Sequence, residues 1–377
     1  MTQSQSVPTM QGAIRSGVVV MVALLLSVGL AGPVSAHGGN SIVRPGESIQ
    51  EALDAANPGD WIVVRAGTYH EQLTIKTDGI HLVGLGAILV PPSSPVDNDC
   101  SGLAGPLTGP ETQAGVCVAG QDVELAPFVL EHRKVLSVGR PVEDVSVTGF
   151  QVRGFSGANI AVLGAEDARV TGNRLVDGER YGFLTVGSTD TKVTGNRVAS
   201  STMLRFIGIC MDNVSGVKVS YNHISGYNVA LCIQTSGADV RNNEVINSCI
   251  GAFVDPFIYG AKVRNNHISA TNPLCAQGNE FGAFGIIVDG AINTDVRHNR
   301  IEGQTLGNPS PPYSTAGIAV VDDPTTTPVA VASGNTVTQN ILRDNYLDLL
   351  VATQGTNNDV SRNSCSSSDP DGLCAPR

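Results

Sequence analysis

The sequence has little of what would place it in several common functional classes. Aromatic residues make up 5% of the 377 residues and charged residues 15%. Acids outnumber bases, with 34 Asp and Glu against 23 Lys and Arg, so there is no basic excess to bind nucleic acid. No CxxC pair and no Cys/His cluster at zinc spacing occurs. These absences argue against nucleic-acid partners and against a structural zinc site.

One uncharged run suggests a targeting segment. Arg15 precedes residues 18–30, and Val34-Ser35-Ala36 follows them. This order is typical of a secretory signal peptide, and thirteen residues are fewer than the roughly 20 needed to span a bilayer. We therefore expect a signal peptide over residues 1–36, a secreted domain over 37–377, and no membrane span after cleavage. Without Arg15 the balance becomes 22 bases against 34 acids, a net charge of −12.

What the sequence does contain is glycine, at 43 residues, and an internal repeat. The pentapeptide Val-Thr-Gly-Asn-Arg begins at Val170 and again, 23 residues later, at Val193. Aligning on its Asn gives a series spaced 21 to 36 residues apart, each member preceded by a Val: Asn173, Asn196, Asn222, Asn243, Asn266, Asn299, Asn335 and Asn363. A period in the low twenties with short strand-like segments predicts a solenoid. The Asn amides are expected to hydrogen-bond from coil to coil.

A second segment recurs about a dozen residues before most of these Asn residues. Its pattern alternates, as in Gly208-Ile209-Cys210-Met211-Asp212, and similar segments begin at 230, 251, 285 and 317. Alternation places Ile209 and Met211 on one face of a strand, so each coil needs its neighbours to bury that face. We expect stacked coils with parallel sheets around one core, with the Asn ladder over about 147–365.

The N-terminal part predicts a cap and a loop. Ser48-Ile49-Gln50-Glu51 has the pattern of a capping box, and an apolar stripe over 49–56 predicts a short helix covering the first coil. Residues 91–120 are rich in Pro and Gly, which predicts a long loop closed by Cys100 and Cys117.

Residues 42–53, the Pro58-Gly59-Asp60 turn and residues 66–71 together resemble the N-terminal cap and first coil of right-handed parallel β-helix proteins. The resemblance covers about residues 42–365 and points to the pectin-lyase-like superfamily. It implies an all-β fold, a single-stranded right-handed parallel β-helix (solenoid) with a short N-terminal capping helix. That superfamily contains lyases, hydrolases, esterases, epimerases and non-enzymes, so it does not assign an activity.

The catalytic motifs of that superfamily are incomplete in this chain. Gly67-x-Tyr69-x-Glu71 is similar to one pectinesterase motif, but the other motifs of that site are missing. Asp322-Asp323 is the one adjacent Asp pair, without the remaining polygalacturonase motifs. Asp255-Pro256 resembles the start of an alginate-epimerase motif whose His and Glu are replaced here by Phe and Ile. Candidate site residues must therefore be inferred from which residues of the recurring strands face outward.

If Ile209 and Met211 face inward, the alternate residues of the recurring strands face outward. This predicts an outer row of Asp212, Gln234, Asp255 and Asp289, with adjacent coils about 4.8 Å apart. Asp255 and Asp289 are the candidate catalytic carboxylates, because such spacing suits glycosidase acids. Asp212, Asp255 and Asp289 are also candidate oxygen ligands for Ca²⁺, the one cofactor considered. A row of solvated strand ends is the alternative interpretation.

Further candidates surround this row. Asp212 and Gln234, together with Phe281 and Tyr313 on the two largest insertions, are the candidate substrate contacts. Lys262 or Arg264 on the neighbouring sheet would supply the base of a lyase, although charge spacing for solubility explains them equally well.

Two functions therefore stay open. The first is a secreted lyase or hydrolase that binds and cleaves an extracellular polysaccharide. The second is a non-catalytic glycan-binding protein or cell-envelope scaffold. In both cases we expect a monomer whose partner is an extracellular polysaccharide.

All eight cysteines follow residue 36, which favours an oxidising compartment. Cys210 and Cys232 occupy the same position on consecutive coils, within the distance range of a disulfide. Stacked free thiols are the alternative for that pair. We predict four disulfides: Cys100–Cys117, Cys210–Cys232, Cys249–Cys275 and Cys365–Cys374.

Overall fold

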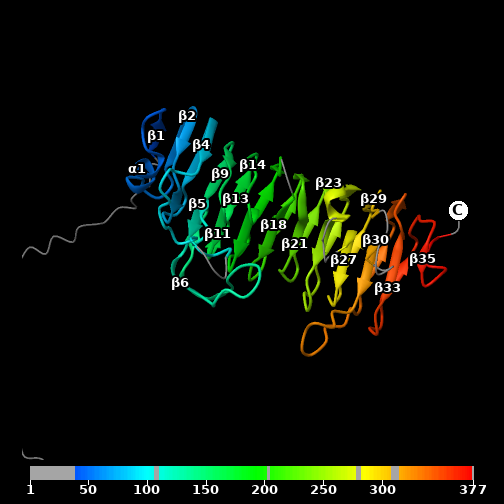
Figure 1. The fold of residues 1–377 in the computed structure, drawn as a ribbon. Coiled ribbons are helices and arrows are strands. Elements are labelled where there is room, and N and C mark those ends of the chain that lie inside the picture. The colour runs from blue at the N-terminus through cyan, green and yellow to red at the C-terminus, as the bar shows by residue number, and fades with distance from the viewer. Residues whose placement is uncertain (1–38, 106–109, 202–203, 277–281, 307–313, 376–377) are drawn as a thin grey trace, which may run out of the picture. The chain divides into compact units, whose positions relative to one another are not determined.

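The computed structural model describes residues 39–105, 110–201, 204–276, 282–306 and 314–375 (Figure 1). The chain divides into two units, Met1–Ala36 and His37–Arg377, and the expected signal peptide lies outside the described residues. In the described part of the second unit, the helices are α1 (Ile49–Asp54) and the short 3-10 helix η1 (Pro273–Ala276). None of its helices is long and apolar enough to cross a membrane. The rest is built of short parallel strands, as the repeat predicted.

One face of the solenoid is a parallel sheet, which we call the site sheet. Each coil adds one strand, and successive strands lie side by side along the solenoid (Figure 1). The described strands are β3 (Leu73–Ile75), β5 (Ala114–Ala119), β11 (Ala158–Leu163), β15 (Tyr181–Val186), β18 (Arg205–Asp212), β21 (Tyr227–Ile233), β24 (Ile250–Val254), β27 (Ala283–Asp289), β30 (Thr315–Val321), β33 (Leu349–Ala352) and β35 (Ser368–Asp369). Inward residues such as Ile209, Leu231 and Ile286 are fully buried, which confirms the predicted alternation.

The second sheet wraps the other two faces of each coil, and we call it the ladder sheet. Strands before the Asn turn are β9 (Ser146–Thr148), β13 (Arg169–Thr171), β16 (Lys192–Thr194), β19 (Lys218–Ser220), β22 (Asp239–Arg241), β25 (Lys262–Arg264), β28 (Asp295–Arg297), β31 (Thr336–Thr338) and β34 (Asp359–Ser361). Strands after it are β10 (Gln151–Arg153), β14 (Arg174–Val176), β17 (Arg197–Ala199), β20 (His223–Ser225), β23 (Glu244–Ser248), β26 (His267–Thr271), β29 (Arg300–Glu302) and β32 (Ile341–Arg343). At the N-terminal end, β1 (Asn40–Val43), β2 (Trp61–His70) and β4 (His81–Val90) complete the described sheet.

A continuous ladder of Asn side chains joins the two halves of the ladder sheet. Asn243 Nδ2 donates to Val219 O and to Asn266 Oδ1, and the same pattern repeats from coil to coil. Phe150 occupies the expected first position, where its N–H donates to Asn173 Oδ1 at 3.0 Å. One predicted member is wrong: Asn340, not Asn335, follows Asn299. The longer connection after β30 displaced the alignment, and Asn335 instead bonds to Asn358 at another turn.

The N-terminal cap explains the motif that ends in Glu71. Ser48 accepts the Glu51 N–H at 3.2 Å as helix N-cap, and α1 ends at Asp54, two residues before the expected end. Glu71 reaches back from the first coil and accepts from the Ser48 hydroxyl and from the N–H groups of Ile49 and Gln50. A carboxylate at a helix N-terminus is electrostatically favourable. In this chain, then, Glu71 fastens the cap.

All four disulfides have the predicted pairing: Cys100–Cys117, Cys210–Cys232, Cys249–Cys275 and Cys365–Cys374. The predicted loop over 91–120 needs correction, because its last part forms β5. Val116 and Val118 alternate inward there and are buried, so this segment is a strand of the site sheet.

An antiparallel hairpin follows β5 directly. Its strands are β6 (Gln121–Leu125) and β7 (Val135–Arg140), and a two-stranded pair, β8 (Val142–Glu143) with β12 (Ala165–Glu166), lies beyond it. We call residues 126–134 between β6 and β7 the arm.

Candidate active site

The structure places four predicted polar residues at equivalent positions of consecutive coils. Asp212 ends β18, Gln234 and Asp255 directly follow β21 and β24, and Asp289 ends β27. Met211 pairs with Ile233, and Val254 pairs with Val288, so the next residues of these strands are also neighbours. Register, set by the buried apolar residues, therefore aligns the strand ends into one row.

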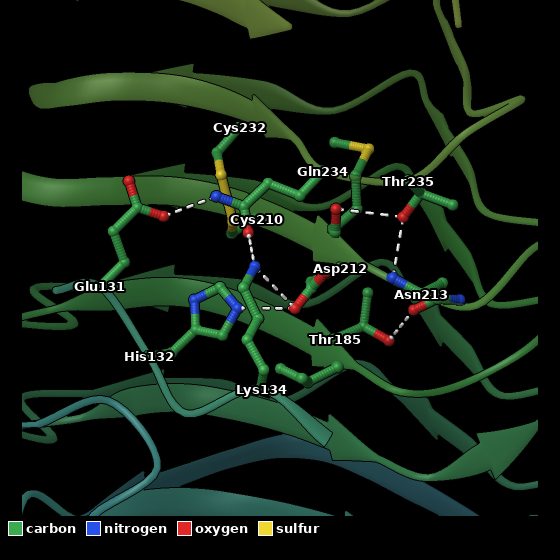
Figure 2. Close-up of polar contacts among 12 residues, drawn as sticks. Glu131, His132, Lys134, Thr185, Cys210, Asp212, Asn213, Cys232, Gln234 and Thr235 are labelled. Carbon is green, nitrogen blue, oxygen red and sulfur yellow. Dashed lines mark hydrogen bonds and ion pairs between the residues drawn. A yellow bond between two sulfur atoms is a disulfide. The ribbon is translucent and has the colours of Figure 1, made fainter. Parts of the chain in front are cut away.

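The arm crosses this row and supplies side chains that the repeat analysis missed (Figure 2). His132 Nε2 lies 3.0 Å from Asp212 Oδ2, and its Nδ1 lies 3.1 Å from the Tyr181 hydroxyl. Lys134 Nζ lies 3.0 Å from the same Asp212 oxygen and donates to Gln234 Oε1 at 2.7 Å. The His132 side chain is fully buried, so the arm is anchored to the sheet.

Gln234 connects the two carboxylates on either side of it. Its Nε2 donates to Glu131 Oε2 at 2.7 Å and to Asp255 Oδ2 at 2.6 Å. With Lys134 donating to its oxygen, every polar atom of the amide has a partner, so its orientation is fixed. Burial, followed by the charge of Glu131, raises the pKa of Asp255 well above its usual range, although Gln234 and Lys134 oppose the rise. Burial therefore favours the protonated form of the Asp255 carboxyl.

Asp289 lies on the next coil in a different environment. It is half-buried, and no described residue donates a hydrogen bond to its carboxylate. Burial, then the charges of Asp323 and Asp322, raises the pKa of Asp289 to about 7. A carboxyl that titrates near neutral pH is suited to proton transfer or nucleophilic attack.

The connection after β30 brings Asp322 and Asp323 beside Asp289. Asp322 accepts from the Ala332 N–H at 2.9 Å, from the Gln354 N–H at 2.7 Å and from the Thr353 hydroxyl. Burial alone would raise its pKa, but these hydrogen bonds outweigh burial and lower it. Asp322 is thus an ionised carboxylate that holds the connection in place and raises the pKa of Asp289 through space.

Two exposed aromatic residues flank the row. Phe257 and Tyr259 lie on the turn after Asp255 and are 49% and 57% exposed. The Phe257 N–H donates to Gly290 O, so this turn lies directly beside Asp289. Phe257 has φ +63°, a left-handed turn conformation that it shares with sixteen other described non-glycine residues. Exposed rings next to carboxylates are suited to packing against sugar rings.

The space enclosed between arm and sheet is small. A cavity of about 40 Å³ is bounded by Glu131, Phe253 and Asp255, among others. That volume accommodates water rather than a sugar ring.

Other predicted site residues are not brought to this row. Lys262 and Arg264 belong to β25 of the ladder sheet, where Arg264 forms an ion pair with Asp295 at 2.5 Å. Phe281 and Tyr313 lie outside the described residues. The predicted calcium ligands Asp212, Asp255 and Asp289 do not form a group with oxygens within 4.8 Å of one another. Asp212 is in addition occupied by Lys134, so the described residues do not fit a shared Ca²⁺.

The one group of metal-binding atoms within that distance, in the part of the chain that is described, is Glu131 with Cys210 and Cys232. These two cysteines form a disulfide, which removes both thiolates as ligands.

Comparison with known proteins identifies the fold. The family model described as "Right handed beta helix region" matches residues 207–375. No curated protein matches the sequence. The alginate lyase from Paenibacillus sp. str. FPU-7 is similar in structure, with a TM-score of 0.51 and 16% identity over 85% of this chain and 99% of that chain. The DFA-IIIase from Arthrobacter chlorophenolicus A6 without its lid is also similar in structure. Its TM-score is 0.51 and its sequence identity 13%, over 87% of this chain and 89% of that chain. At such identities the likeness shows the fold alone.

Proposed function

We propose that this right-handed parallel β-helix, which resembles the pectin-lyase-like superfamily, binds and hydrolyses an extracellular polysaccharide at the row of strand ends on the site sheet. The observation that carries the proposal is the position of Asp255 and Asp289 on adjacent coils, in environments that shift their pKa values by different amounts. Two such carboxylates are the minimum machinery of a glycosidase.

The environments assign a role to each carboxylate. Asp255 stays protonated and donates its proton to the leaving glycosidic oxygen, while Gln234 holds its other oxygen. Asp289, partly ionised near pH 7, attacks the anomeric carbon. Adjacent coils lie about 4.8 Å apart, close to the roughly 5–5.5 Å separation of retaining enzymes rather than the wider inverting one. Asp255 then removes a proton from the water that releases the sugar.

The positions of Lys262 and Arg264, away from the carboxylate row, favour hydrolysis over elimination. A lyase must neutralise the sugar carboxylate and remove a carbon-bound proton, and Lys262 or Arg264 is the residue predicted from the sequence as the base that removes it. Both lie on the ladder sheet, and Arg264 is bound to Asp295. Among the described residues, Lys134 is the one Lys or Arg whose side chain bonds to the row, and it pairs with Asp212.

The charge of the row also favours one class of substrate. Glu131, Asp289 and Asp323 contribute negative charge beside the row, against a single lysine that is itself bound to Asp212. A polyanion would meet like charges here, at a cost that lowers affinity. The carboxylate row is therefore proposed to act on neutral or amino-sugar polymers, with Phe257 and Tyr259 as packing surfaces.

The experiment is a polysaccharide panel in which both reducing ends and unsaturated products are followed for the wild type, Asp255→Asn and Asp289→Asn. We expect new reducing ends without unsaturated products, and a loss of at least about 100-fold in each variant. The control is Asp344→Asn, an exposed Asp just after β32 of the ladder sheet. Unsaturated products would contradict hydrolysis. Binding without turnover by the wild type would instead favour the glycan-binding scaffold.

A further inference from the structure

A groove of about 390 Å³ lies on the ladder sheet, away from the strand ends of the site sheet. Its lining includes the turn glycines Gly149, Gly172 and Gly195 and, on the strands that follow these turns, Gln151, Arg174 and Arg197. None of the residues that line it is acidic. The whole chain has 34 acidic and 23 basic residues, so a surface with two arginines and no acidic residue is unusual in it.

Arg174 and Arg197 are neighbours across this groove. They are register partners on adjacent coils, so their backbones lie about 4.8 Å apart. Both side chains are exposed, and no described residue forms an ion pair or a side-chain hydrogen bond with either guanidinium. Two like charges held side by side without a counter-charge are unfavourable unless an anion joins them.

Farther along the solenoid, the basic residues at the equivalent strand positions have acidic partners. Arg197 pairs in register with His223, and His223 Nδ1 lies 3.1 Å from Glu244 Oε2. Arg300, three coils beyond His223, is held by Glu302 at 2.8 Å. Within this row of described positions, the basic residues without an acidic partner are therefore the two that line the groove.

The turn glycines leave open space beside the two arginines. Gly172 and Gly195 have φ values of +65° and +67°, which favour glycine at these turns. A Cβ at either position would meet nothing within 4 Å, so the space beside the two arginines is open to a ligand. The groove runs across successive coils and is therefore parallel to the solenoid axis.

We propose that this groove binds a carboxylate-bearing polysaccharide chain, lying along the solenoid axis, through Arg174 and Arg197. A guanidinium binds carboxylate in a two-bond fork, and two arginines at coil spacing can hold one carboxylate or successive ones. Gln151, in register with Arg174, adds a hydrogen-bonding amide at one end. An elongated row of donors is suited to an extended chain better than to a single small anion.

The groove offers little to other polyanions. Phe150 is its one aromatic residue and is 1% exposed, so no ring is available to stack on nucleic-acid bases. The site is separate from the carboxylate row and goes beyond hydrolysis: it would tether the protein to an acidic polymer of the matrix while the other face acts on a different chain.

The test measures binding of a polyuronate and of a neutral polysaccharide of matched length, by calorimetry at low and high salt. We expect the wild type to prefer the polyuronate, and each of Arg174→Gln and Arg197→Gln to weaken it about tenfold. Arg300→Gln is the matched control, because it occupies the same outer row but already has Glu302 as its partner. Asp289→Asn should leave this binding unchanged.

Each other outcome overturns the assignment. Unchanged affinity in the double variant would exclude the two arginines. An equal loss in Arg300→Gln would indicate generic charge attraction. Equal binding of a single-stranded oligonucleotide or of inorganic polyphosphate would exclude recognition of a uronate chain. No binding of the polyuronate at all would exclude this site, whether or not the protein hydrolyses a polysaccharide.

Discussion

Replacing Asn243 with Leu tests how much the ladder stabilises the solenoid. The Asn243 side chain makes four hydrogen bonds: Nδ2 donates to Val219 O and Asn266 Oδ1, and Oδ1 accepts from the N–H and the Nδ2 of Asn222, all at 3.0 Å. The residue is 2% exposed, so water cannot replace these partners. At about 1 kcal/mol net per bond the loss is about 4 kcal/mol, of which added apolar burial recovers about 1. We expect the free energy of unfolding to fall by about 3 kcal/mol.

Urea unfolding followed by far-UV circular dichroism is the suitable assay, because the single tryptophan, Trp61, reports on the N-terminal coils only. The matched variant is Asn173→Leu at the first member of the ladder. The Asn173 side chain makes three hydrogen bonds: Nδ2 donates to Val147 O and Asn196 Oδ1, and Oδ1 accepts from the Phe150 N–H. The loss of unfolding free energy in Asn173→Leu should therefore be smaller by about 1 kcal/mol. A loss below about 1 kcal/mol at Asn243 would refute the reasoning.

Three further predictions follow from the site and the disulfides. The folded-state pKa of Asp289 is about 7 against roughly 3.9 when unfolded, so its ionisation destabilises the fold increasingly from pH 4 to 7, by about 4 kcal/mol in full. Asp289→Asn should therefore raise the melting temperature at pH 8 but not at pH 4; equal values at pH 8 would contradict the raised pKa. Lys134→Met should reduce turnover by freeing Gln234, yet change stability by less than about 1 kcal/mol because Lys134 is 54% exposed, and a large stability loss would assign it a structural role. Peptide mapping without reduction should find Cys210 linked to Cys232, whereas free thiols there would show the two stacked but unbonded.

The fold was predictable because the residues that repeat in the sequence are the ones whose side chains point into the core. Val170, Val193 and Val219 stack in register and are buried, and the Asn three residues later has the same partners in each coil. The prediction failed at Asn335, where an Asn in the connection after β30 lay nearer the expected spacing than Asn340 did. Spacing alone could not decide between them, whereas Val337, three residues before Asn340 and paired with Val296, does.

The site was predictable only in part, for a related reason. Alternation along the strands gave the positions of Asp212, Gln234, Asp255 and Asp289. It could not give the arm, because Glu131 and Gln234 are 103 residues apart and the arm has no period of its own. Lys262 is close to Asp255 in sequence, but the turn between them carries it onto the other sheet. Contacts made by irregular insertions leave no signal in a repeat.

The pH dependence of kcat/KM on the hydrolysed polysaccharide tests the central claim most directly, because it reports the pKa values of the free enzyme. The account predicts a rising limb near pH 7 from ionisation of Asp289. Asp323→Asn removes the largest charge that raises this pKa, so the limb should move to lower pH while the maximal rate is retained. A rising limb that stays in place in Asp323→Asn, or activity that survives in Asp289→Asn, would contradict the assignment of Asp289.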